Sequence, residues 1–246
     1  MTRRVVSPIV NDSPSLKDSS VTDPPVVDSL VVDSPVVGAA GPTGRRPLGL
    51  LAPLVLPDDV RPALPAPDAP PPGATLGQHY ARCYGCGDAA SAGLHMHFTV
   101  GDGVRVVSEF VVTADHEGAP GLAHGGLLTA ALDETQATLL WLLRMPAVTA
   151  RLETDFLAPV PVGSIVRIEA SCLGVSDRKI YTAAEGRLVG EATSEGLSDG
   201  VLAMRSAALY VVVPIEHFTA FGRRDLVEAG MNRPVEPDGH RFEVNP

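Results

Sequence analysis

One apolar stretch, LLTAALDETQATLLWLLR, most constrains how this chain can fold. It runs from Leu127 to Arg144 and ends before Pro146, which disfavours helical backbone at the residue preceding it. A helix that is apolar nearly all round must be buried inside a domain. Two carboxylates, Asp133 and Glu134, nevertheless lie in its middle. An ionised carboxylate among apolar side chains is costly unless it is paired or solvated, so this pair needs an explanation.

Strand-like runs lie on both sides of this helix. Two precede it, Gly93–Val100 and Val104–Thr113, and the Gly-Asp-Gly between them is typical of a hairpin. Four follow it: Ala147–Leu157, Ser164–Ser176, Lys179–Gly190 and Val201–Val213. This order predicts an α+β protein with the hotdog fold, a long antiparallel sheet wrapped around one central helix. An ordinary α+β sandwich fits the order of elements nearly as well.

The composition divides the chain into three parts. Fifteen of the 23 prolines lie in residues 1–75, and the first aromatic residue is Tyr80. A segment of this kind buries too little apolar surface to offset the entropy lost on ordering. We therefore expect residues 1–75 to be a disordered segment rich in Pro, Ser and Asp. Residues 76–216 are expected to form the hotdog domain, and residues 217–246 a short helix with a polar tail.

The charge limits the classes of partner. The formal net charge of −10 argues against nonspecific binding to nucleic acid or to acidic membranes. Three cysteines suit a reducing compartment. We expect a soluble cytoplasmic protein with no nucleic-acid or membrane partner.

Cys83 and Cys86 form a single C-x-x-C motif. A zinc site would need two more ligands, and His79, His95 and His97 lie nearby in the sequence. A strand would place His95 and His97 on the same face. Our preferred interpretation is a turn that packs under the domain and binds no metal.

Four motifs occur between Cys83 and Val213: CYGCG…AGLHMHF, GAPGLAHGGLLTAALDET, VTARLETDFLAPVPVGS and DRKIY. As a set they resemble the hotdog-fold acyl-CoA thioesterases of the phenylacetate-degradation (PaaI-like) type. The resemblance implies a hydrolase that cleaves acyl-CoA thioesters to the free acid and coenzyme A. It also implies a homodimer or a tetramer built from dimers, and no cofactor is expected.

The resemblance places the thioester carbonyl at the start of the central helix. His124, Gly125 and Gly126 match the loop whose backbone N–H holds this carbonyl, and Gly125 and Leu127 are expected to contact the substrate. Physical chemistry favours the same role, because a helix N-terminus presents unpaired N–H groups that two glycines leave accessible. One such oxyanion donor contributes about 3–4 kcal/mol in other enzymes. The alternative is that the glycines only permit close packing. His124 is expected to orient the loop or touch the thioester rather than transfer a proton.

The remaining site residues follow from the same resemblance. Asp133 matches the catalytic carboxylate, and Thr149 matches a hydroxyl residue that helps to place the water. Arg178 and Lys179 match a basic pair that contacts coenzyme A. Some family members carry an Asn six residues before the His, where this chain has Gly118. The sequence leaves open whether Asp133 activates water or attacks the carbonyl to form an anhydride.

Two further functions are compatible with the sequence, a noncatalytic acyl-CoA-binding hotdog module and a hotdog dehydratase or hydratase. The latter class usually needs a His paired with a carboxylate at a different spacing. Glu134 points about 100° away from Asp133 and is interpreted as a rim or interface carboxylate. Gly126 and Asp133 are separated by roughly 10 Å along a helix, so one straight helix cannot easily present both to one substrate. This separation predicts sites shared between two subunits.

Overall fold

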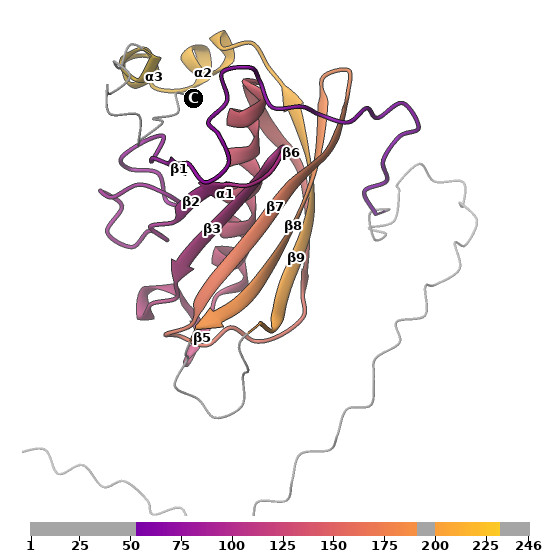
Figure 1. The fold of residues 1–246 in the computed structure, drawn as a ribbon. Helices are drawn as coiled ribbons and strands as arrows, with labels where there is room; N and C mark the ends of the chain where they lie inside the picture. Colours follow the sequence, from indigo (N-terminus) through magenta and orange to yellow (C-terminus); the bar gives the residue numbers. More distant parts are fainter. Residues whose placement is uncertain (1–52, 191–199, 232–246) are drawn as a thin grey trace, which may run out of the picture. The chain divides into compact units, whose positions relative to one another are not determined.

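The computed structural model describes residues 53–190 and 200–231 (Figure 1). The expected disorder of residues 1–52 and most of the expected C-terminal tail lie outside the described residues. Within them, seven strands form one antiparallel sheet in the order β1-β2-β3-β7-β8-β9-β6. In this order the strands are Thr75–Leu76, His97–Val100, Arg105–Val111, Ile165–Ser176, Lys179–Gly190, Leu202–Val212 and Ala147–Phe156.

One long helix, α1 (Gly125–Leu143), runs along one face of this sheet and contacts β3, β6, β7, β8 and β9 (Figure 1). This arrangement confirms the predicted α+β hotdog fold. A 3-10 helix, η1 (Ala114–His116), and a small hairpin of β4 (Glu117–Ala119) and β5 (Leu122–Ala123) lead into α1. In the described part, α2 (Glu216–Phe221) and α3 (Arg224–Met231) follow the sheet, where one short helix was predicted. None of the helices described is long and apolar enough to cross a membrane.

Apolar side chains fill the space between α1 and the sheet. Leu132, Leu139 and Leu142 of α1 are fully buried, as are Val166 and Ile168 of β7. The helix therefore contributes several fully buried apolar side chains to the core, as its sequence predicts.

Buried polar groups fix how α1 is rotated about its own axis. Gln136 donates a hydrogen bond of 2.7 Å to the Ser206 hydroxyl and accepts one of 2.8 Å from the Thr182 hydroxyl. On the neighbouring face, the hydroxyls of Thr135 and Ser108 are 2.7 Å apart. A buried polar group left without a partner costs about 1–3 kcal/mol, so a rotation of α1 that broke these bonds would be strongly unfavourable.

The segment before β1 is part of the domain, so the prediction of disorder up to residue 75 is wrong for residues 53–75. Arg61 and Val175 exchange two backbone hydrogen bonds of 2.9 Å each. Further along, the Ala66 amide donates to the Leu142 carbonyl at the end of α1, at 2.8 Å.

An open stretch of β7 explains why this segment is held. β3 begins at Arg105, which pairs with Ser171, so the rest of β7 extends beyond β3. The segment covers that part closely: a Cβ built at Gly174 would lie 2.3 Å from a Val60 methyl group. Composition shows that the segment has no aromatic side chain to bury. It does not show that unpaired backbone groups on β7 are available to it.

We predict that a chain starting at Gly77 is less stable than one starting at Pro53. The shorter chain loses β1 and the hydrogen bonds of Arg61 and Ala66, each contributing about 0.5–1.5 kcal/mol. Thermal unfolding should show a melting temperature lower by at least about 2–4 °C. Equal melting temperatures for the two chains would show that the segment contributes nothing to stability.

Candidate active site

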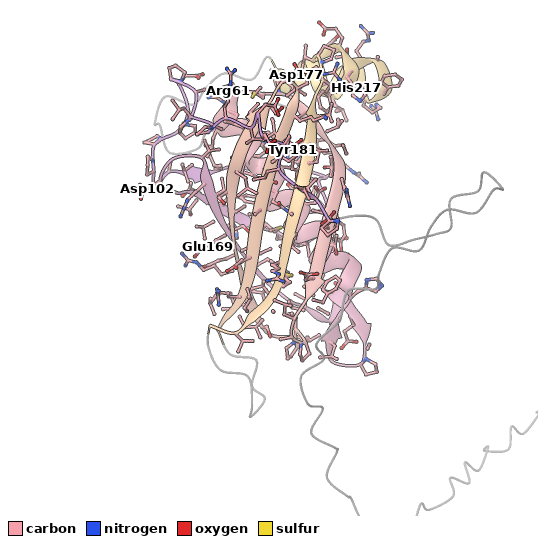
Figure 2. The ribbon with its side chains drawn as sticks, turned by 90° about the vertical axis from the view of Figure 1, so that its right-hand side faces the viewer. Arg61, Asp102, Glu169, Asp177, Tyr181 and His217 are labelled. Atoms are coloured by element: carbon pink, nitrogen blue, oxygen red, sulfur yellow. The ribbon has the colours of Figure 1, made fainter. Side chains whose placement is uncertain are left out.

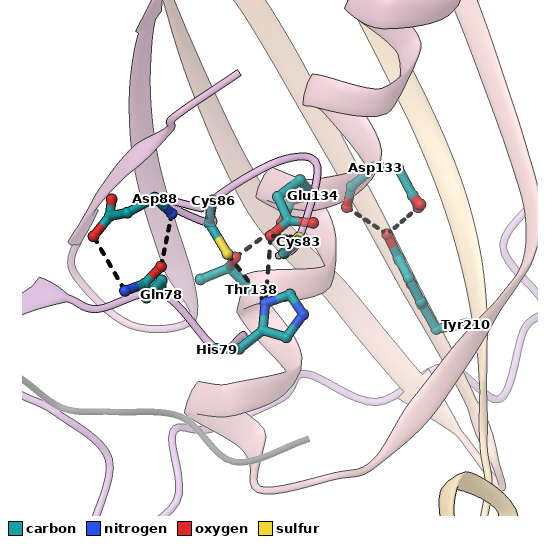
Figure 3. A network of polar contacts seen from close by, with 9 residues as sticks. All are labelled: Gln78, His79, Cys83, Cys86, Asp88, Asp133, Glu134, Thr138 and Tyr210. Atoms are coloured by element: carbon teal, nitrogen blue, oxygen red, sulfur yellow. Dashed lines mark hydrogen bonds and ion pairs between the residues drawn. The ribbon is translucent and has the colours of Figure 1, made fainter. Parts of the chain in front are cut away.

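Asp133 lies on the side of α1 that faces β6 and β9, and two hydroxyls hold one of its oxygens. Thr149 of β6 donates to Oδ1 at 2.9 Å. Tyr210 of β9 donates to the same oxygen at 3.0 Å and also lies 3.1 Å from the Asp133 carbonyl oxygen (Figure 3). Thr149 and Tyr210 are direct partners in the register of the two strands. Among the described residues no hydrogen-bond donor reaches Oδ2, so one carboxylate oxygen is fixed and the other is available.

Tyr210 is the site residue that the sequence analysis missed. Its side chain is buried, and burial together with the negative charge of Asp133 raises the pKa of the Tyr210 hydroxyl well above its usual range. The hydroxyl therefore stays protonated and remains a donor to Asp133. Strand alternation could have placed Tyr210 on the helix side with Ser206 and Ala208. Its pairing with Thr149 depends on a register that joins distant parts of the chain.

The start of α1 is capped by His124. Its Nδ1 accepts a hydrogen bond of 2.9 Å from the Gly126 amide, and its carbonyl accepts from the amides of Leu127 and Leu128. The Gly126 N–H, expected to hold the thioester carbonyl, is therefore hydrogen-bonded to its own chain. The His124 side chain is exposed.

The absence of a side chain at position 118 is required by the packing of this loop. A Cβ built at Gly118 would lie 2.6 Å from the Cα of His124, so an Asn does not fit without moving the helix start. The neighbouring carboxylate, Glu117, accepts a hydrogen bond of 3.0 Å from the Gly121 amide within the β4–β5 hairpin. The Glu117 carboxylate is thus bonded within the β4–β5 hairpin.

Arg178 and Lys179 lie in and directly after the turn between β7 and β8, and both are exposed. Figure 2 shows Asp177, the residue before them, at the end of the sheet where α2 with His217 also lies. Lys179 pairs with Val211, one position from Tyr210, but β9 separates β8 from β6. In the described part of the chain no hydrogen bond or ion pair joins either side chain to Asp133. The structure therefore does not bring the two basic side chains into contact with this carboxylate.

Glu134 faces a different part of the molecule, and its interpretation as a rim or interface carboxylate is wrong. It meets His79, Cys83 and Cys86, and the four side chains place one donor atom each within 4.8 Å of one another (Figure 3). Burial would lower the pKa of His79, but hydrogen bonds and charges from Cys83 and Glu134 outweigh it and raise this pKa to about 9. The same contact with His79 lowers the pKa of the Glu134 carboxyl despite its burial. The two carboxylates of α1 therefore have separate environments on separate faces of the helix.

Comparisons with known proteins show which proteins part of this domain is similar to. Residues 120–194 match the family model described as the thioesterase superfamily. The matched segment contains the helix start, Asp133, Thr149 and the basic pair. This match bears out the predicted resemblance to hotdog-fold thioesterases.

Particular relatives are also similar to the chain. Acyl-coenzyme A thioesterase THEM5 of Mus musculus is 34% identical over 85 residues, which cover 35% of this chain and 34% of that protein. Acyl-coenzyme A thioesterase THEM4 of Xenopus laevis is 32% identical over 71 residues, covering 29% and 32%. The chain thus spans about a third of the length of the curated relatives it matches. The solved PaaI protein of E. coli is 19% identical, with a TM-score of 0.44 and coverage of 52% and 86%.

We predict that His124 acts on stability as the cap of α1. His124→Ala removes the acceptor for the Gly126 amide and should lower the free energy of unfolding by about 0.5–2 kcal/mol. His124→Asn supplies another capping acceptor and should keep most of the stability. Urea unfolding of both variants measures the difference. If both variants unfold like the unchanged protein, the cap does not stabilise the helix.

Proposed function

We propose that this protein hydrolyses acyl-coenzyme A thioesters to the free acid and coenzyme A, with Asp133 as the catalytic carboxylate. The observation that carries the proposal is the geometry of Asp133 on a buried helix. Thr149 and Tyr210 hold one of its oxygens, and the other has no donor in the described structure. The match of residues 120–194 to the thioesterase superfamily supports the same reaction.

The two hydroxyls have distinct roles in this mechanism. Tyr210 is buried and fixes Asp133 Oδ1. Thr149 donates to the same oxygen and keeps lone pairs with which it can accept a hydrogen bond from a water molecule. A water placed in this way lies beside Oδ2, which takes its proton as the water oxygen attacks the thioester carbonyl carbon. The carbon–sulfur bond then breaks, and the coenzyme A thiolate leaves and is protonated.

A second route uses the same atoms. Oδ2 attacks the carbonyl carbon itself and expels the thiolate, which forms a mixed anhydride that water then hydrolyses. In both routes the carbonyl oxygen gains negative charge and needs a donor. The Gly126 N–H at the positive end of α1 fits this need once His124 has turned aside.

We propose that each site is shared by two subunits. Gly126 and Asp133 are seven residues apart in one continuous helix, a separation of about 10 Å along its axis. The reacting atoms must approach within about 3–3.5 Å, so one helix does not supply both groups to one carbonyl. Two antiparallel helices related by a two-fold axis would bring Asp133 of one copy to the Gly126 end of the other.

The β6 edge supports this assembly. β6 is the last strand of the sheet, so one side of its backbone has no strand partner in the described chain. Phe156 and Leu157, at and just after its end, are 53% and 47% exposed, and the Phe156 ring packs near Gly125. An open edge with exposed apolar side chains is a surface that a second copy can cover. We propose a homodimer, alone or within a tetramer.

Arg178 and Lys179 are proposed to bind the phosphates of coenzyme A. Both are exposed on a turn, and neither has an ion-pair partner among the residues described. Guanidinium and ammonium groups suit phosphate oxygens.

One observation favours a second candidate, an acyl-CoA-binding module without turnover. The Gly126 amide is already bonded to His124, so the carbonyl donor is not free in this conformation. A ligand could then bind through the basic turn without being hydrolysed.

We predict that Asp133→Asn lowers the hydrolysis rate by about a hundredfold or more, because Asn is nearly isosteric but is neither basic nor nucleophilic. Release of coenzyme A, measured with a thiol reagent, gives the rate, and thermal unfolding checks the fold. Asp102→Asn is the matched control, since Asp102 is exposed in the loop between β2 and β3, at the other end of the strand order from β6, and should be nearly neutral. Turnover by Asp133→Asn close to that of the control would contradict the assignment. Acyl-CoA binding by the unchanged protein without any coenzyme A release would favour the binding module.

We predict that two inactive variants restore activity when they form mixed dimers. Asp133→Asn lacks the carboxylate, and Gly126→Pro lacks the carbonyl donor; proline is tolerated in the first helical turn. After co-refolding in equal amounts, half of the dimers are mixed and each has one intact site, so about a quarter of the activity should return. Separately tagged copies prove that mixed dimers formed. Mixed dimers without activity would show that the sites are not shared.

A further inference from the structure

We propose that His79, Cys83, Cys86 and Glu134 form a zinc site that fastens the loop before β2 to the central helix. Three ligands come from this loop and the fourth from α1, as Figure 3 shows. The inference is independent of the proposed hydrolysis, because Glu134 and its partners lie on a different face of α1 from Asp133 and its partners.

Three of the distances between the donor atoms are close to those of a zinc site. Cys86 Sγ lies 3.2 Å from His79 Nδ1, Cys83 Sγ lies 3.4 Å from Glu134 Oε1, and His79 Nδ1 lies 3.5 Å from the same oxygen. Tetrahedral zinc has bonds of about 2.0–2.3 Å, which separate its ligand atoms by about 3.3–3.8 Å. These three separations lie in or close to this range, and the remaining ones do not exceed 4.8 Å, so the donor atoms must move closer by up to about 1 Å to surround one ion.

The chemistry of the donors selects zinc. Two cysteine sulfurs, one imidazole and one carboxylate are all common zinc ligands, and thiolates disfavour magnesium and calcium. Both cysteines are free rather than joined in a disulfide. Three of the four groups can carry negative charge, and only His79 can oppose them, so a divalent cation supplies the charge that the cluster lacks. Four protein ligands close the coordination sphere, which is typical of a structural site.

The loop is shaped to present these donors. Its backbone makes two tight turns, in which the Cys83 amide donates to the Tyr80 carbonyl and the Gly87 amide to the Cys83 carbonyl, each at 2.9 Å. Gly85 allows the loop to touch the helix, because a Cβ there would lie 2.5 Å from Glu134 Cγ. The absence of a side chain at this position is therefore needed for Glu134 to reach the cluster.

Packing also limits the motion of the imidazole. The His79 ring lies edge-on to Trp141 of α1, with centroids 5.7 Å apart. The ligands are thus held by turns, by a close glycine contact and by an aromatic neighbour. These contacts restrict the four side chains more than solvent restricts polar side chains on an exposed surface.

The sequence alone pointed to a metal-free turn because it showed too few ligands at suitable spacing. His95 and His97, the other candidates near the C-x-x-C motif, are not part of the cluster. Cys172 is also separate from it, since its thiol donates to the Gly174 carbonyl in β7. Cys172 therefore provides a matched control for a cysteine outside the proposed site.

The experiment measures metal in the full chain. After loading with zinc and dialysis against metal-free buffer, elemental analysis should find about one zinc ion per chain. Cys83→Ser and Cys86→Ser should retain almost none, whereas Cys172→Ser should retain the full amount. With cobalt in place of zinc, the unchanged protein should show thiolate-to-metal charge transfer and the intense visible bands of a tetrahedral site, and Cys83→Ser should lose both.

A second measurement on the unchanged protein guards against variants that fail to fold. Mass spectrometry after brief alkylation should show that bound zinc protects Cys83 and Cys86, and that a chelator exposes both without changing Cys172. The proposal is overturned if the loaded, reduced protein retains no zinc. It is also overturned if Cys83→Ser retains as much as Cys172→Ser, or if alkylation of Cys83 and Cys86 does not respond to zinc. A loss of hydrolysis would not show whether zinc is bound. Both measurements, the zinc content and the alkylation of the cysteines, therefore report zinc binding directly.

Discussion

The hydrogen bonds of Gln136 are the interaction on which the rest of the site depends. This side chain is buried between α1 and the sheet and connects the helix to both β8 and β9. Because it fixes the rotation of α1, it also decides which way the neighbouring residues point. Asp133 then faces Thr149 and Tyr210, and Glu134 faces the loop with the two cysteines. The two carboxylates are adjacent in the chain but have different neighbours, which explains how a buried helix accommodates both.

The sequence predicted the parts of the fold that depend on local patterns. The boundaries of β8 agree fully, and α1 begins two residues earlier and ends one residue earlier than predicted. The family resemblance also selected Asp133 and Thr149, which the structure brings into contact. Their catalytic roles remain proposals, as do those of Gly126, Arg178 and Lys179.

The features that were missed all depend on contacts between distant residues. Tyr210 meets Asp133 across 77 positions, and Cys83 meets Glu134 across 51. Neither contact leaves a periodic signal in the chain. The pairing of Arg61 with Val175 was missed for a related reason. The proline content describes only the segment that contains Arg61, whereas the backbone groups that bind this segment belong to the part of β7 that extends beyond β3.

The position of Gln136 also restricts how the length of α1 can change in related chains. A single residue inserted between Glu134 and Gln136 would turn the preceding part of the helix by about 100° relative to the sheet. Asp133 would leave its two hydroxyls, and Glu134 would leave the loop, while the core leucines after Gln136 stayed in register. Length changes should therefore be tolerated in the loops that flank α1 and excluded from the few residues between Asp133 and Gln136.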